Sequence, residues 1–205
     1  GTWSKEQKVL YNGTSGNVKA IVAAMLEDGT SAVAYTLDKD GKDNTTDDRE
    51  IAYTVIDQKG EHHPVLATKD SYLDENPQLA AVTFPDKEEH FVLGWYAEQS
   101  AAVDSADVLN GGTDSSSRDE KTSDIRLLSF GETGADQQLL PDSISQAAED
   151  ESVSITSNFR FVKNAETIND LSILWVERTE GQLEQIGQTQ GTSGKNVLPD
   201  SKERD

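Results

Sequence analysis

The chain has 205 residues, of which 18 are basic and 38 acidic, and its formal net charge at pH 7 is −20. A charge of this sign opposes binding to nucleic-acid phosphates and to anionic lipid, which argues against both as partners. The sequence has no cysteine and no run of 18 apolar residues, so thiolate metal sites, disulfide scaffolds and membrane-inserted helices are excluded.

Short apolar segments separated by turn signals make up the first part of the chain. Residues 19–26 are a near-continuous apolar run, typical of a buried strand, and Asp28-Gly29 after it is a turn signal. Five strands are predicted here, at residues 3–11, 19–26, 31–37, 50–57 and 65–68, the last being a short edge strand.

The same order of segments recurs twice further along the chain. Six more strands are predicted, at residues 79–84, 91–98, 124–130, 138–144, 159–162 and 171–177. Tyr35, Trp95 and Trp175 fall at matching places in the second strand of each repeat. An aromatic that recurs at equivalent strand positions favours packing between neighbouring repeats.

A polar tract follows each of these aromatic strands, at residues 40–48, 100–123 and 181–205. Tyr35 and Trp95 lie 60 residues apart, and Trp95 and Trp175 lie 80 apart. Removing the 9 residues of the first tract and the 24 of the second leaves intervals of 51 and 56 residues. These are close to the roughly 40–50 residues of a four-stranded propeller blade.

The strand order therefore predicts an all-β chain that forms a segment of a β-propeller made of four-stranded antiparallel blades. Residues 1–15 would supply an end strand of a preceding blade, 16–75 and 76–150 two blades, and 151–205 a partial blade with a polar tail. Over about residues 3–180 the chain resembles the β-propeller repeats of large bacterial secreted and cell-surface proteins. Because the resemblance rests on strand order, it transfers no site residues. Two small β-sandwich domains would also suit the number of strands.

Oxygen-bearing side chains alternate with a glycine in the first polar tract, which is the arrangement that a hard cation such as calcium needs. The candidate calcium ligands are Asp38, Asp40, Asp43 and Asp47, with Gly41 and Asn44 between them. The alternative is an acidic hairpin loop with Gly, Asn and Asp turn chemistry.

Other side chains with possible chemistry favour structural roles. His62 and His63 are adjacent and would point to opposite sides of an extended segment, so we expect them, like His90, to serve surface or packing roles. Trp3, Trp95 and Trp175 could form a sugar-binding platform, but core packing is the favoured interpretation of the two that recur.

The functional hypothesis is a non-enzymatic structural or interaction module of a large secreted or surface-attached bacterial protein, with a protein or glycan ligand. The alternative is part of a glycan-active propeller enzyme or a carbohydrate-binding module. The third repeat is expected to stop one strand short and to leave residues 171–177 as an unpaired edge. The remainder of the propeller would then come from a second fragment or chain. We expect an extracellular or cell-surface location.

Overall fold

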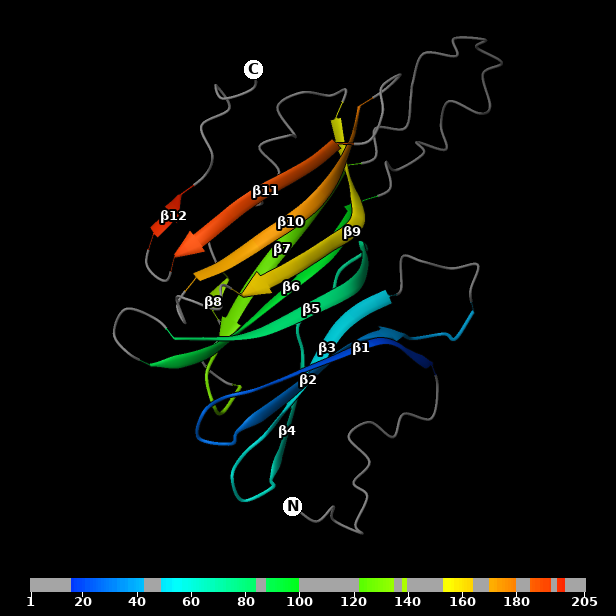
Figure 1. Ribbon diagram of the computed structural model, residues 1–205. Coiled ribbons are helices and arrows are strands. Elements are labelled where there is room, and N and C mark those ends of the chain that lie inside the picture. The colour runs from blue at the N-terminus through cyan, green and yellow to red at the C-terminus, as the bar shows by residue number, and fades with distance from the viewer. Residues whose placement is uncertain are drawn as a thin grey trace.

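Figure 1 shows the computed structural model of the chain. It describes residues 16–42, 49–83, 88–99, 122–134, 138–139, 153–163, 170–179, 185–192 and 195–197. These residues form twelve strands in three four-stranded antiparallel sheets, and no helix occurs among them. The prediction of an all-β chain is confirmed. Within the described ranges no helix has the length and hydropathy to cross a membrane. The strand predicted at residues 3–11 lies outside them.

The first sheet, called sheet A, has its strands side by side in chain order. They are β1 (Asn17–Met25), β2 (Ser31–Asp38), β3 (Arg49–Ile56) and β4 (His62–Leu66). The turn between β1 and β2 is closed by Asp28, whose Oδ1 accepts the Thr30 N–H at 2.7 Å. The short fourth strand lies at the edge of the sheet, as predicted, but it begins at His62 and ends at Leu66 instead of covering residues 65–68.

Sheet B repeats this arrangement with strands β5 (Leu73–Thr83), β6 (Glu89–Gln99), β7 (Thr122–Phe130) and β8 (Gln138–Leu139). Strand β5 begins at Leu73, six residues before the predicted start at Leu79. Apart from Leu73, the added residues are polar or proline, so they lack the apolar alternation that marks a strand in the sequence.

Sheet C corrects the expectation of an incomplete third repeat. Its strands are β9 (Val153–Lys163), β10 (Asp170–Thr179), β11 (Gln185–Thr192) and β12 (Lys195–Val197). Strand β10 pairs with β9 on one side and with β11 on the other, so it is not an open edge. The polar segment 185–192 was expected to be loop, but strand pairing uses backbone hydrogen bonds and needs no apolar side chains.

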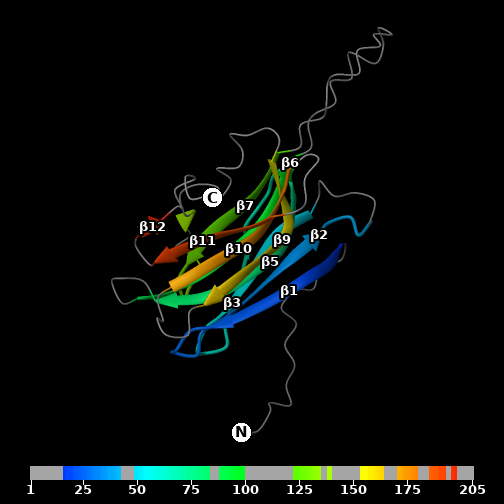
Figure 2. The same ribbon diagram turned by 45° about the horizontal axis from the view of Figure 1, so that its top comes forward.

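The three sheets stack in chain order with sheet B in the middle (Figures 1 and 2). One apolar core, which includes Tyr53, Phe91 and Phe130, joins sheets A and B. The rings of Tyr53 and Phe130 are stacked with centroids 4.0 Å apart. A second core with Phe159, Ile173 and Trp175 joins sheet C to Tyr96 and Ile125 of sheet B. Each sheet thus buries the apolar face that it cannot cover alone.

The recurring aromatic residues are buried, as the sequence predicted. Tyr35 is 5% exposed, Trp95 2% and Trp175 6%. Trp95 belongs to the core between sheets A and B, whereas Trp175 belongs to the core between sheets B and C. Trp3 lies outside the described residues. Packing between sheets is therefore the role of the two described tryptophans.

Candidate functional site

The first strand of every sheet is interrupted by a β-bulge at the same distance from its start. In β1 the bulge residues Ala20 and Ile21 lie opposite Tyr35, and in β5 Asn76 and Pro77 lie opposite Trp95. In β9, residues 156–158 lie opposite Val176. Each bulge begins at the fourth residue of its strand. Bulges are enriched beside binding and active sites because they redirect side chains.

Two of the bulges place a residue other than glycine in the left-handed region. Ala20 has φ 49° and Asn76 has φ 54°. Such a conformation costs alanine on the order of 1 kcal/mol, whereas asparagine tolerates it better. The Asn76 Nδ2 also donates a hydrogen bond to the Ser157 carbonyl oxygen, which links the bulge of β5 to that of β9.

All three bulges line one cavity of about 280 Å³, here called the bulge cavity. Each first strand contributes two neighbouring residues to the lining, namely Lys19 and Ala20, Glu75 and Asn76, and Ser157 and Asn158. Thr36 of β2, Arg49 of β3 and Arg160 of β9 complete it. The cavity thus lies where the first strands of the three sheets come together.

The bulge in β1 decides which way Lys19 faces. In a regular strand Lys19 and Val22, three residues apart, would point to opposite faces. The extra residue lets Lys19 pair with Thr36 and Val22 with Ala34, and both paired partners lie on the face that packs on sheet B. The bulge therefore brings a cation to the end of the apolar core.

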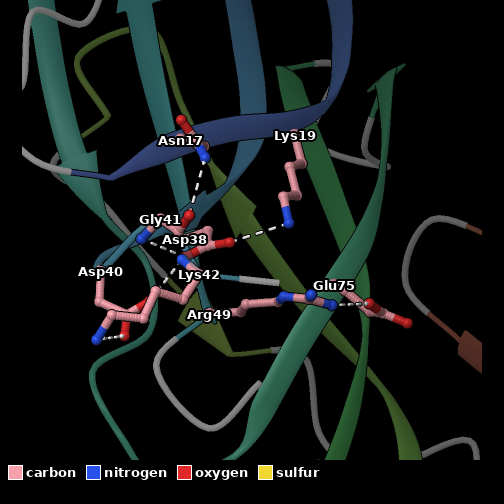
Figure 3. A network of polar contacts seen from close by, with 8 residues as sticks. All are labelled: Asn17, Lys19, Asp38, Asp40, Gly41, Lys42, Arg49 and Glu75. Carbon is pink, nitrogen blue, oxygen red and sulfur yellow. Dashed lines mark hydrogen bonds and ion pairs between the residues drawn. The ribbon is translucent and has the colours of Figure 1, made fainter. Parts of the chain in front are cut away.

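Ion pairs order two of the cavity's basic side chains (Figure 3). The Lys19 Nζ lies 2.9 Å from Asp38 Oδ2, and the Asp38 side chain is fully buried. The Arg49 Nη1 lies 3.1 Å from Glu75 Oε2, which connects sheet A to sheet B. Arg160 donates from Nη1 to the carbonyl oxygen of its neighbour Phe159 at 2.7 Å.

Two buried polar atoms of the lining have no hydrogen-bond partner in the described structure. They are the hydroxyl oxygen of Thr36, a residue 1% exposed, and Nε of Arg49. The Arg49 Nε–H can only donate, and the Thr36 hydroxyl can donate as well. Buried donors are nearly always satisfied, so these two are sites at which a bound acceptor would be stabilised.

The two described calcium-ligand candidates, Asp38 and Asp40, are not among the residues that line the bulge cavity. Asp38 accepts the Gly41 N–H at 2.8 Å through Oδ1 and pairs with Lys19 through Oδ2. Asp40 accepts the Lys42 N–H at 2.8 Å and lies 3.3 Å from the Lys42 Nζ. Asp43 and Asp47 are outside the described residues. Calcium binding at these four residues stays a prediction, which a calcium titration of the melting temperature checks.

A second group of carboxylates was not singled out by the sequence. Glu50, Asp70 and Asp74 place carboxylate oxygens within 4.8 Å of one another between sheets A and B. Lys39 lies 2.5 Å from Glu50, and Arg126 lies 3.3 Å from Asp70. Each of these two acids thus has its own cation.

Asp74 is the third member of that carboxylate group, and it is fully buried. Its Oδ1 accepts the Trp95 Nε1–H at 2.8 Å. Burial, reinforced by the nearby Asp70 charge, raises the pKa of the Asp74 carboxyl to about 7. These contacts indicate a charge-balanced structural network that ties the segment between β4 and β5 to the sheets.

Asp57, Glu61 and His63 form a further group with ligand atoms within 4.8 Å of one another. His63 Nε2 lies 3.5 Å from Asp57 Oδ2 at the turn between β3 and β4. Hydrogen bonds from the backbone of Glu61, and further contacts with His63, lower the pKa of Asp57. His63 is the second residue of the edge strand β4 and is partly exposed, which agrees with its predicted surface role.

Sequence reasoning missed the residues that line the bulge cavity. The one signal in the chain is Asn76-Pro77, because proline inside a strand marks an edge or a bulge. Nothing in the sequence joins Lys19, Arg49, Glu75 and Arg160, since they come from strands that meet only after the sheets have stacked.

Comparison with known proteins does not show a family. No protein-family model matches the chain, and no curated protein sequence does. Among solved structures, the endo-arabinase from Bacteroides thetaiotaomicron VPI-5482 aligns with a TM-score of 0.42 and 13% identity. The alignment covers 89% of this chain and 57% of that one, so the chain spans little more than half of the enzyme's length. At this TM-score the similarity carries no conclusion about fold or activity.

Proposed function

We propose that the chain is a non-enzymatic binding module that holds a polar ligand in the bulge cavity. The observation that carries the proposal is that three bulges, each at the fourth residue of a first strand, line the same cavity. A bulge leaves one residue outside the ladder and disrupts pairing, so a single bulge is weak evidence of function. Three bulges at the same place in their strands that converge on one polar cavity are better explained by a bound ligand.

The lining favours binding over hydrolysis. Glycoside hydrolysis ordinarily uses two carboxyl groups roughly 5–10 Å apart on either side of the bond that is cleaved. The described lining contains one acid, Glu75, and that carboxylate is paired with Arg49. No aromatic side chain occurs among the described lining residues, so a stacking platform for a sugar ring gains no support there. The glycan-active alternative is therefore the weaker proposal.

The stacked sheets are proposed to be consecutive blades of a β-propeller. Three features support this: each sheet is a four-stranded meander, the sheets follow chain order, and the first strands contact one another, β1 with β5 and β5 with β9. In a propeller the first strands of neighbouring blades surround the axis, where ligands commonly bind. On this proposal the bulge cavity would face the axis.

The parent protein is proposed to be a large bacterial protein that is secreted or attached to the cell surface. The absence of cysteine and the acidic, polar composition support this location. Detection of the protein on intact cells of its source, with a cytoplasmic protein as the control, tests it. A signal that appears only after the cells are lysed would contradict the proposal.

The binding proposal is tested by titrating a panel of neutral and acidic oligosaccharides and short peptides while recording amide chemical shifts. A true ligand should shift amides of all three bulges together. Deleting Ala20 leaves Lys19 and Val22 on one face with regular pairing, and so removes only the bulge. We expect this deletion to abolish binding, while Ala20→Gly, which keeps the bulge and its positive φ, binds as the parent does.

Two outcomes would count against the proposed module. If the amide chemical-shift changes occur only at residues away from the three bulges, the ligand binds at another site. Cleavage of any oligosaccharide in the panel, detected by chromatography of the mixture, would instead favour the glycan-active alternative.

A further inference from the structure

The bulge cavity is a basic site in a strongly acidic protein. Its described lining carries three cations, Lys19, Arg49 and Arg160, and one acid, Glu75. Asp38 neutralises Lys19 and Glu75 neutralises Arg49, at 2.9 Å and 3.1 Å. Arg160 is left without a carboxylate partner among the described residues, where its recorded bond is to a backbone carbonyl. Counted over the described residues, the cavity therefore has an excess of one positive charge, whereas the whole chain carries −20.

The unpartnered donor groups among the described lining residues favour a ligand that accepts hydrogen bonds. The Thr36 hydroxyl and the Arg49 Nε–H are buried donors without a hydrogen-bond partner among the described residues, and they come from adjacent strands of sheet A. Hydrogen bonds to an ionised acceptor are roughly twice as strong as those between neutral groups. A planar acceptor with two oxygens also matches the forked geometry of a guanidinium group. Charge and hydrogen bonding thus favour the same class of ligand.

We propose that the bulge cavity binds the carboxylate group of a small ligand, with Thr36, Arg49 and Arg160 as its donors. This inference rests on the proposed binding function and adds the chemistry of the bound group. The cavity volume of about 280 Å³ suits one small moiety rather than a long chain. The carboxylate can belong to an acidic sugar or to the end of a peptide, and matched probes separate these sources.

The test uses the full chain and two pairs of probes that differ in charge. Glucuronate is compared with glucose, and N-acetylalanine with N-acetylalaninamide, by amide chemical shifts at low salt. We expect the charged member of at least one pair to shift the bulge amides of β1, β5 and β9, and its neutral partner to bind at least tenfold more weakly. The pair that responds identifies the source of the carboxylate. Affinity should fall as salt is added, because exposed charges are screened.

Three substitutions separate this proposal from a general polar site, because two of them should weaken binding of the charged probe and the third should strengthen it. Arg160→Gln should weaken binding of the charged probe about tenfold, the usual effect of losing one charge-assisted hydrogen bond. Thr36→Val keeps the side-chain shape, so it should weaken binding while leaving the unliganded protein at least as stable. Glu75→Gln should strengthen binding, because it removes the competing acid from Arg49.

Lys59→Gln is the matched control, since Lys59 is an exposed cation at the turn between β3 and β4. It should bind as the parent chain does. If neither charged probe shifts the bulge amides, or if Glu75→Gln weakens binding, the carboxylate proposal is wrong. If charged and neutral probes shift those amides with equal affinity, the carboxylate is excluded but the binding module stands.

Discussion

At the scale of single residues, the Asp74 carboxyl gives the protein a specific dependence on pH. Its pKa is raised from 3.8 to about 7, mainly by burial. As pH rises, the unfolded chain therefore loses this proton before the folded protein does. Stability should fall between about pH 4 and 7 and level off above that range, because protonation favours the folded state only until the folded group itself ionises.

Asp74→Asn should remove this contribution, which is on the order of a few kcal/mol at neutral pH. The asparagine Oδ1 can still accept the Trp95 Nε1–H. Urea denaturation at several pH values should show a shallower fall for the variant than for the parent, and a more stable variant at pH 7.5. The exposed Glu61→Gln is the control for the general effect of removing one acid from a chain of charge −20. Parallel pH profiles for the parent and Asp74→Asn would contradict the prediction.

The spacing of residues in the sequence predicted the burial of individual side chains better than it predicted their polar contacts. Burial of Trp95 and Trp175 followed from their recurrence, because a repeated aromatic on an apolar strand packs against a neighbouring repeat. Tyr35 is also buried, but the pairing register turns it to the face of sheet A that points away from sheet B. The Asp38 carboxylate was predicted as a calcium ligand from its loop sequence. Its contact with Lys19 depends on cross-strand pairing and a bulge that the loop sequence does not contain.

At the scale of elements, the packing of sheet C on sheet B depends on the absence of a side chain at Gly94 in β6. A Cβ built there would lie 2.6 Å from the Phe161 ring and 3.0 Å from Leu127. Gly94→Ala should therefore force these residues apart and lower stability by about 1–3 kcal/mol, the usual range for overpacking.

Gly131→Ala is the matched control for this prediction. Its added Cβ would meet only the His90 Nδ1, at 3.9 Å, which is an ordinary contact. Urea denaturation of both variants measures the difference. Equal stabilities of Gly94→Ala and Gly131→Ala would show that the two sheets are not in contact at Gly94.

The pairing of β10 is a second property that belongs to this scale. Because β10 lies between β9 and β11, its backbone amides should exchange with solvent as slowly as those of β6, the second strand of sheet B. A chain that ends at residue 184 should lose part of this protection. Fast amide exchange along β10 in the full chain would contradict this pairing and would support the unpaired edge that the sequence predicted.

At the scale of the whole molecule, sheet A has exposed apolar side chains along the two edges of its outer face. The pairing register turns Ile21, Met25 and Leu66 away from sheet B, and they are 65%, 65% and 42% exposed, whereas Tyr35 and Ala52 in the middle of the same face are buried. In a propeller a further blade would cover this face. We therefore propose that another four-stranded sheet, from a second fragment or chain, packs on it.

The chain by itself should associate through this face. Light scattering after size-exclusion chromatography should show species above the 22.3 kDa of one chain, in a concentration-dependent manner. Ile21→Lys with Met25→Lys should reduce the association without lowering stability, because both side chains are exposed. A variant with lysines introduced at two other exposed positions controls for the added positive charge. A parent chain that stays monomeric at high concentration would contradict the proposal.

The sequence by itself determined the all-β class, most strand positions and the buried aromatics, because apolar runs and turn signals are local. It did not reveal β11, whose place rests on backbone pairing with β10 rather than on its own apolar residues. Only the tertiary structure decided the bulge cavity. Its charges come from β1, β3, β5 and β9, and they meet because the sheets stack and because the bulge in β1 turns Lys19 toward the cavity. Long-range packing of this kind leaves no pattern in a local stretch of sequence.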